Sequence, residues 1–185
     1  MSITILMSGG LDSFIAGLYL KSEQNVKALF IDWGQPSVSQ EKVSARYCAD
    51  YLDFKFESCK VQIENKNIKI GANRPGPRVV PGRNKAFIQA AIRTGAKSVA
   101  IGCIKDDFDS YLDCRREYFD DLELELGIKI LTPLIYKRKS EAVQVGALMP
   151  LHITWSCYQS KGSDPCGSCS SCNERQAAMS LTFRK

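Results

Sequence analysis

The stretch that decides the fold is ITILMSGGLDS, residues 3–13. An apolar, β-branched run leads into two adjacent glycines, and a helical apolar pattern follows from Phe14 to Leu20. This order predicts a buried strand, a tight turn and the start of a helix. Glycines let a ligand approach the backbone closely, and a helix start presents unpaired N–H groups and the positive end of its dipole. The stretch therefore predicts an anion site, with phosphate as the usual guest.

The loop differs from the two best-known phosphate loops. It lacks both the Gly-Lys-Ser/Thr ending of a Walker loop and the third glycine of a dinucleotide fingerprint. Ser-Gly-Gly-x-Asp-Ser, residues 8–13, instead resembles the pyrophosphate loop of the adenine-nucleotide α-hydrolase-like enzymes, which use ATP to adenylate a substrate oxygen. The alternative is an ordinary strand-to-helix turn, because glycine pairs are common. The match of the whole motif in a strand-turn-helix context favours the nucleotide site.

Length and composition are those of an ordinary globular protein. The chain has 185 residues, 44% hydrophobic and 24% charged, and we expect one domain over residues 1–185. A net charge of +5 suits an anionic ligand such as ATP but does not predict a nucleic-acid surface. The N-terminus lacks the features of a signal peptide, and no stretch approaches transmembrane length. We therefore expect a cytoplasmic protein without membrane contact, in which eight cysteines indicate metal binding or catalysis rather than disulfides.

Strand and helix patterns alternate along the chain. Strands are expected near residues 3–7, 26–31, 54–57, 98–102 and 128–134, and helices near 11–20, 37–52, 83–94, 116–126 and 139–149. Ser37 and Gln40 have the spacing of a capping box. This order predicts an open, doubly wound, mostly parallel five-stranded α/β sheet of Rossmann-like type. Ligands of such sheets bind beyond the carboxyl ends of the strands.

Two loops carry candidate ligand contacts. Residues 65–81 are rich in Gly and Pro and carry Arg74 and Arg78, so this segment is either a functional loop or a plain surface connection. Arg83 follows at a helix mouth, where its planar guanidinium suits phosphate or carboxylate. The second loop, residues 103–115, holds four aspartates after a strand, which makes them candidates for Mg²⁺ or substrate contacts.

A small segment at about residues 155–175 predicts a metal site. Four cysteines lie there with the spacing C-x8-C-x2-C-x2-C, between turn-forming glycines and a proline. Four sulfurs in a closed shell suit structural Zn²⁺. The competing interpretation is an iron–sulfur cluster, whose motifs also contain C-x2-C-x2-C, but no further cysteine follows at the ferredoxin spacing. The predicted ligands are Cys157, Cys166, Cys169 and Cys172.

The remaining cysteines and the single histidine have plainer interpretations. Cys48 and Cys59 are expected to be core or inert, and Cys103 to be core as well. Cys114 lies in the acidic loop, and catalysis stays open for it. His152 is expected to be structural, because four cysteines already complete a metal shell.

Taken together, the motifs resemble the 7-cyano-7-deazaguanine synthase family over nearly the whole chain. The matching stretches are residues 8–13, 32–35, 81–84, 107–115 and 132–141, together with the cysteine spacing. The resemblance implies ATP-dependent C–N ligase chemistry: the carboxylate of 7-carboxy-7-deazaguanine is adenylated, ammonia displaces AMP, and the amide oxygen is adenylated in turn to leave the nitrile. It implies ATP and Mg²⁺ beside Zn²⁺, a small-molecule substrate and a homodimer.

The resemblance also assigns roles to residues at matching positions. The expected catalytic residues are Asp12, Arg83 and Lys139. The expected ATP-binding residues are Ser8, Gly9, Gly10, Leu11, Asp12, Ser13, Gly82 and Arg83. The expected substrate-binding residues are Asp107, Phe108, Tyr111, Asp113 and Arg115.

The substrate loop departs from the family pattern, chiefly at Lys105, where the family has Glu; Asp106, Asp109, Ser110 and Leu112 also differ. A carboxylate accepts hydrogen bonds from a guanine-like ring, and a lysine does not. Three alternatives therefore stay open. The first is a homologue that couples a deazaguanine-type carboxylate to a protein amine in antiviral defence. The others are a tRNA thiolation enzyme and a non-catalytic nucleotide sensor.

Overall fold

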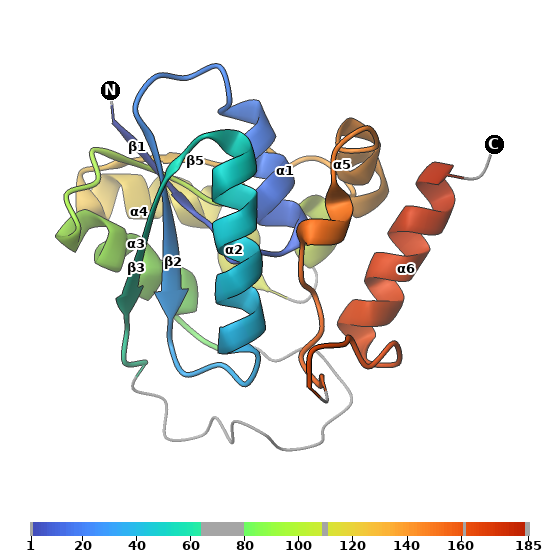
Figure 1. Cartoon of the computed structure of the whole chain (residues 1–185). Helices are drawn as coiled ribbons and strands as arrows, with labels where there is room; N and C mark the ends of the chain where they lie inside the picture. Colours follow the sequence, from blue (N-terminus) through green and yellow to red (C-terminus); the bar gives the residue numbers. More distant parts are fainter. Residues whose placement is uncertain (1, 64–79, 109–110, 161, 184–185) are drawn as a thin grey trace.

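The computed structural model describes residues 2–63, 80–108, 111–160 and 162–183 (Figure 1). Several expectations fall outside these residues. They concern the greater part of the loop between residues 65 and 80, with Arg74 and Arg78, and the departures at Asp109 and Ser110. The expectation of one domain also stays a prediction.

Five strands of the described chain form a single parallel sheet. They are β1 (Ile3–Leu6), β2 (Val26–Asp32), β3 (Lys55–Lys60), β4 (Ser98–Ala100) and β5 (Lys129–Leu131). Their order is β3-β2-β1-β4-β5, and all four neighbouring pairs are parallel. The predicted open, parallel five-stranded sheet is confirmed.

Helices cover both faces of this sheet (Figure 1). They are α1 (Leu11–Tyr19), α2 (Val38–Leu52), α3 (Arg83–Arg93), α4 (Arg116–Leu126), α5 (Lys139–Val145) and α6 (Ser170–Phe183), with short 3-10 turns η1 (Lys105–Asp107), η2 (Leu112–Cys114) and η3 (Leu151–Ile153). Side chains of α1, α2 and α5 form one buried cluster, and those of α3 and α4 form a second.

The central strands explain why there are two clusters. Side chains of a strand alternate between the faces of a sheet. Ile3 and Ile5 belong to the cluster under α1, whereas Leu6 belongs to the cluster under α3 and α4. Phe30 and Ile31 of β2 divide in the same way. Both faces are thus apolar, as expected for a parallel sheet covered on both sides.

Three local predictions were wrong. The helix expected to reach Met149 ends at Val145, because the backbone leaves the helical conformation at Gly146, with φ −85° and ψ 2°. The predicted capping box fails, since the Ser37 hydroxyl donates to Glu41 instead and the Gln40 amide donates to the carbonyl of Gly162. Helix α6 was not predicted, because its sequence has little helical periodicity.

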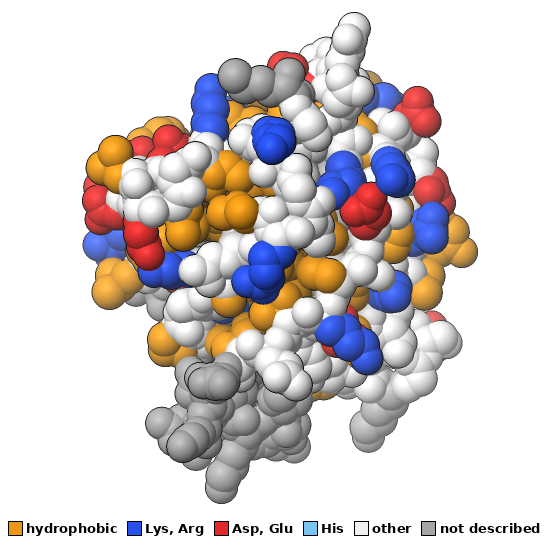
Figure 2. All heavy atoms as spheres, turned by 90° about the vertical axis from the view of Figure 1, so that its left-hand side faces the viewer, with side chains coloured by type: hydrophobic (Ala, Val, Ile, Leu, Met, Phe, Trp, Pro, Cys, Tyr) orange, Lys and Arg blue, Asp and Glu red, His pale blue; other side chains and the backbone are white. Residues whose placement is uncertain are grey.

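The surface carries no concentration of charge on the face seen in Figure 2. Lys and Arg side chains are spread over that face, with acidic side chains among them. Within the described residues, no helix is both long and apolar enough to cross a membrane.

The turn after β1 is packed against backbone on two sides. Gly9 has a φ of +82°, and a Cβ there would lie 2.5 Å from the carbonyl oxygen of Glu41 in α2. Gly102, just after β4, lies against the start of α1, so that a Cβ would be 2.8 Å from the Asp12 carbonyl. The chain runs from β1 outward to β3 and then returns to the other side of β1 at β4. The two glycine contacts therefore lie at the switch point of strand order, where open α/β sheets bind ligands.

We expect Gly9→Ala to lower the free energy of unfolding more than Gly34→Ala does. Gly34 has nearly the same φ, +81°, but nothing lies within 4 Å of its Cβ position. Gly34→Ala should therefore cost only the left-handed strain, about 1–2 kcal/mol, and Gly9→Ala should cost that plus a clash, for a total of about 3 kcal/mol or more. Urea unfolding measures both. Equal losses would show that Gly9 is not sterically confined.

Candidate active site

The loop after β1 is held together by the hydroxyls of Ser8 and Ser13. The Ser13 hydroxyl donates to the carbonyl of Gly10 at 3.0 Å, and the Gly10 N–H donates to Ser8 Oγ at 3.3 Å. The two hydroxyl oxygens lie 3.1 Å apart. Among the described residues, no side chain caps the start of α1. The N–H groups of its first turn, which includes Leu11, are therefore left for an anionic ligand.

A lysine–carboxylate cluster stands beside this helix start. The Lys139 ammonium at the start of α5 lies 3.3 Å from Asp12 Oδ2 and 3.7 Å from Glu174 Oε2. Burial alone would lower the pKa of Lys139, but Asp12, Glu174 and Asp107 outweigh burial and raise it. Lys139 thus keeps its positive charge at neutral pH. The structure brings together Asp12 and Lys139, two of the three predicted catalytic residues.

Asp12 is the most constrained carboxylate of the cluster. Burial raises its pKa, and the Lys139 ammonium partly offsets that rise. Its Oδ1 is buried and has no hydrogen-bond partner among the described residues. A buried carboxylate oxygen without a donor is costly unless a ligand or ion completes it.

The acidic loop after β4 lies against the same cluster. Asp106 Oδ2 accepts the backbone N–H of Lys139 at 2.8 Å. Burial, with the negative charge of Asp12, raises the pKa of Asp107 to about 6. The carboxylates that follow β1 and β4 thus meet at one edge of the sheet.

The positive charge of Arg83 also acts on side chains of this region. Arg83 is the first residue of α3, after Gly82 in the left-handed region. Burial raises the pKa of Tyr111 to about 12 and also raises that of Tyr158, and the positive charge of Arg83 opposes both shifts. The charges of Lys139 and Asp12 also act on the Tyr158 phenol, so it lies near both cations. Both phenols remain protonated, and therefore hydrogen-bond donors, at neutral pH.

The predicted substrate residues divide into two groups. Asp107 faces Asp12 and Lys139, and Tyr111 lies within the field of Arg83. Arg115, by contrast, is turned back onto the loop: its Nε and Nη2 donate to the carbonyl of Phe108 at 3.1 and 3.0 Å. The Phe108 ring packs against the core under α3 and α4.

The same loop is tethered to α3 through Asp113. Its carbonyl accepts a 2.8 Å hydrogen bond from the buried side chain of Asn84. The contacts of Arg115, Phe108 and Asp113 in the structure therefore shape the loop.

Sequence reasoning missed three residues of this region: Glu174, Trp155 and Tyr158. Glu174 comes from α6. The backbone N–H of Trp155 donates to the carbonyl of Gly9 at 2.8 Å. All three belong to the C-terminal segment that was assigned to metal binding alone. Their position next to the predicted ligands Cys157 and Cys172 was the available signal, but only the folded chain brings them to the loop after β1.

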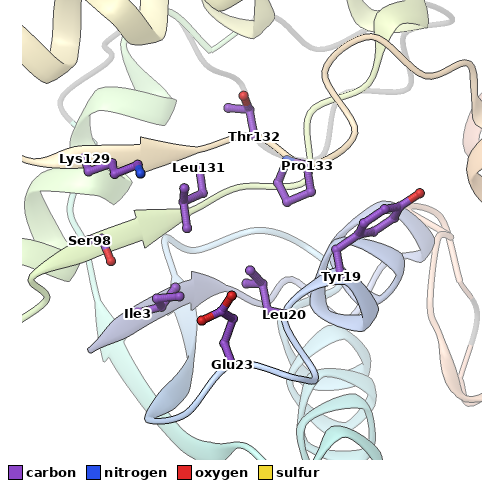
Figure 3. Close-up of a pocket in the computed structure, with 9 residues that line it drawn as sticks. All are labelled: Ile3, Tyr19, Leu20, Glu23, Ser98, Lys129, Leu131, Thr132 and Pro133. Carbon is purple, nitrogen blue, oxygen red and sulfur yellow. The ribbon is translucent and has the colours of Figure 1, made fainter. Parts of the chain in front are cut away.

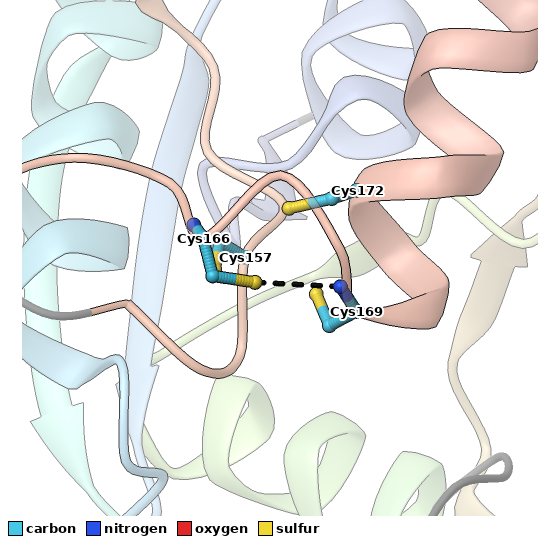
Figure 4. A group of neighbouring side chains, drawn as sticks. All are labelled: Cys157, Cys166, Cys169 and Cys172. Carbon is cyan, nitrogen blue, oxygen red and sulfur yellow. Dashed lines mark hydrogen bonds between the residues drawn. The ribbon is translucent and has the colours of Figure 1, made fainter.

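The four predicted metal ligands converge (Figure 4). The sulfurs of Cys157, Cys166, Cys169 and Cys172 all lie within 4.8 Å of one another. Backbone N–H groups donate to the sulfurs: those of Gln159 and Cys166 to Cys157, and that of Cys169 to Cys166, each at 3.3 Å.

The backbone N–H groups of Ser168 and Cys169 lower the pKa of Cys166 to about 6, which favours the thiolate form that binds metal. This donor set fits one metal ion. The other four cysteines lie outside this cluster: Cys48, Cys103 and Cys114 are buried, and Cys59 is partly buried. His152 is exposed on η3.

A separate hollow of about 580 Å³ lies between the end of α1 and edge strand β5 (Figure 3). Its lining residues are Ile3, Tyr19, Leu20, Glu23, Ser98, Lys129, Leu131, Thr132 and Pro133. This lining contains none of the predicted catalytic, ATP-binding or substrate-binding residues. The carboxylates and the lysine with shifted pKa values make the loop after β1, and not this hollow, the candidate active site.

Comparison with known proteins agrees with the sequence motifs. The family model of the queuosine biosynthesis protein QueC matches residues 2–182. The 7-cyano-7-deazaguanine synthase of a Nitratiruptor species is 34% identical, over 95% of this chain and 92% of its own. That of Prochlorococcus marinus (strain AS9601) is 35% identical, over 96% and 92%.

Among solved structures, a Methanocaldococcus jannaschii protein described as a predicted subunit of tRNA methyltransferase has a TM-score of 0.58. It is 20% identical, with 80% of this chain and 74% of that chain covered. At this identity the similarity shows a shared fold.

We expect Cys169→Ser to lower the bound metal from one ion per chain toward zero and to lower the thermal midpoint. A missing thiolate opens the shell, and structural metal sites contribute directly to folding. Elemental analysis of the purified protein measures the metal. Cys59→Ser, on β3, is the control and should keep the metal. Full metal content in Cys169→Ser would contradict a four-cysteine site.

We expect Asp107→Asn to stabilise the protein at pH 7.5 and to have little effect at pH 4.5. Its pKa is about 6 in the folded state against 3.8 ordinarily, so the folded chain binds this proton more tightly. The contribution of Asp107 to the free energy of unfolding therefore falls as pH rises from about 4 to 6. The substitution should restore about 3 kcal/mol above that range. Urea unfolding at both pH values measures it, with exposed Asp121→Asn as control. The same gain in the free energy of unfolding at both pH values would contradict a raised pKa of Asp107.

Proposed function

The chain belongs to the QueC family of queuosine biosynthesis proteins, and we propose that it uses ATP to convert 7-carboxy-7-deazaguanine and ammonia to 7-cyano-7-deazaguanine. The single observation that carries the proposal is the position of Asp12 and Lys139 beside an uncapped helix start at the switch point of the sheet. That arrangement is built to hold and release an oligophosphate.

ATP binds with its pyrophosphate at the loop after β1. The N–H groups at the start of α1 donate to the phosphate oxygens, and the Ser8 and Ser13 hydroxyls keep the loop in the required shape. Lys139, kept positive by its carboxylate neighbours, and Arg83 at the start of α3 stabilise the charge that develops on the departing pyrophosphate.

The unpartnered Asp12 Oδ1 fits a Mg²⁺ ligand, because a hard cation prefers carboxylate oxygen. When bound, the ion would spread the negative charge of the phosphates.

The substrate carboxylate attacks the α-phosphorus of ATP, and pyrophosphate leaves. Ammonia then attacks the activated carbonyl carbon, and AMP leaves with the amide formed. In a second round the amide oxygen attacks another ATP, and loss of AMP and a proton gives the nitrile. The protein holds ATP, the carboxylate and ammonia in place. This positioning lowers the barrier, because the entropy cost of bringing the reactants together is paid on binding.

The deazaguanine ring lies against the loop that follows β4. Asp107 and the phenol of Tyr111 face the site and offer an acceptor and a donor. Phe108, Asp113 and Arg115 keep that loop folded. The four cysteines would hold Zn²⁺, and an ion bound by four thiolates would be structural. The homodimer and the cytoplasmic location stay predictions.

A second candidate keeps the adenylation and changes the acceptor to a protein amine. The observation that favours it is Lys105, an exposed cation where the family resemblance predicts a glutamate. Mass spectrometry of reactions with Mg-ATP, ammonium and 7-carboxy-7-deazaguanine separates the candidates. Nitrile with AMP supports the first. AMP and an acyl-adenylate without amide or nitrile supports the second. Bound ATP without AMP would overturn both.

We expect Lys139→Met to lower kcat about 10²- to 10³-fold, because it removes a cation that faces the developing phosphate charge. Lys139→Arg keeps the charge and should recover part of the rate. AMP formation under saturating ATP measures kcat. Lys42→Met, at an exposed position of α2, is the control and should match the wild type. A wild-type kcat in Lys139→Met would remove this residue from the mechanism.

A further inference from the structure

Cys103 and Cys114 form a buried pair that the proposed function does not use. Cys103 follows β4, and Cys114 ends η2, so the two residues close the base of the substrate loop between them. Both side chains are nearly buried, 6% and 5% exposed. Their sulfurs lie 3.6 Å apart, with the Cys103 thiol donating to Cys114 Sγ. This is van der Waals contact between two reduced thiols.

The pair can become a disulfide with small movements. A disulfide has a sulfur–sulfur distance of about 2.05 Å, so the two atoms must approach by about 1.5 Å in total. Rotation of the side chains supplies displacements of that size.

The two sulfurs are not equivalent. Cys114 Sγ accepts from the Cys103 thiol and from the Asn84 side-chain amide at 3.7 Å. Cys103 is the donor in this pair, and its burial with Cys114 beside it raises its pKa well above the ordinary value. The geometry thus makes Cys114 the sulfur that is oxidised first and Cys103 the thiol that resolves it.

We propose that Cys103 and Cys114 are a redox modification site, at which a small peroxide closes a reversible disulfide that slows the enzyme. The burial of both sulfurs favours an oxidant of the size of hydrogen peroxide. The Cys114 thiolate attacks one peroxide oxygen and takes up OH as a sulfenic acid, and the other oxygen leaves as water after protonation. The Cys103 sulfur then attacks Cys114 Sγ, and the OH leaves as a second water. Two thiols and one peroxide give one disulfide and two waters.

Formation of the Cys103–Cys114 disulfide acts on the substrate loop through Asn84. The Asn84 amide holds both the Asp113 carbonyl and Cys114 Sγ. Drawing Cys114 toward Cys103 moves it away from Asn84 and disturbs the tether of the loop. The effect on rate rests on the proposed function, whereas formation of the disulfide does not.

Peptide mapping tests the bond in the metal-loaded protein. Trypsin separates the two cysteines into peptides 98–105 and 106–115, since Lys97, Lys105 and Arg115 are cleavage sites. After treatment with hydrogen peroxide and alkylation of free thiols, we expect these peptides to be linked, and dithiothreitol to separate them. Cys48→Val, at another buried cysteine, should leave the link intact. Finding Cys103 and Cys114 both alkylated after peroxide would overturn the proposal.

The rate provides the second readout. Peroxide should slow AMP formation by the wild type at least fivefold, reversibly with dithiothreitol, and should slow Cys103→Val far less. Metal content measured in parallel shows whether the four-cysteine site is intact. Equal inactivation of Cys103→Val, or a linked pair with an unchanged rate, would overturn the switch.

Discussion

The structure depends on one close packing of backbone against backbone. The loop after β1 has no space for a side chain at Gly9, where α2 approaches, and the start of α1 leaves none at Gly102, where β4 ends. These contacts fix the direction of α1, and with it the direction in which its uncapped N–H groups point. Because β1 and β4 flank the switch point of the sheet, the same contacts bring Asp12 and the acidic loop to one edge.

The C-terminal segment completes this edge rather than standing apart from it. The backbone N–H of Trp155 donates to the carbonyl of Gly9, and Glu174 of α6 forms an ion pair with Lys139. Arg175 fastens the beginning of α6 to the preceding turn, with hydrogen bonds of 2.7 Å to the Leu151 carbonyl and 2.6 Å to Thr154 Oγ1. The cysteine cluster lies between these contacts in the sequence. A metal ion there would therefore order a wall of the proposed nucleotide site as well as the segment itself.

The sequence predicted the strands, their parallel order and the cysteine cluster, because each of these follows from local patterns. Apolar runs define strands such as β1, and sulfur spacing defines a metal shell such as Cys157 to Cys172. What it did not predict depends on contacts between distant segments. Glu174 lies near Lys139 only once α6 packs against α5, and Ser37 donates to Glu41 rather than to the backbone of α2. Helix α6 itself has weak periodicity, so its position comes from tertiary packing rather than propensity.

The departure at Lys105 leaves the described anchors of the substrate loop in place. The loop keeps its shape through Asn84, through Arg115 on the Phe108 carbonyl, and through the Asp107 carbonyl, which accepts the N–H of Tyr111 at 2.8 Å. These anchors are backbone contacts or residues that match the family. Lys105 is exposed, and its side chain takes part in none of these three hydrogen bonds. The substitution at this position therefore changes the charge near the site while the loop scaffold is retained. A family scaffold can in this way carry a changed recognition of substrate without a changed fold.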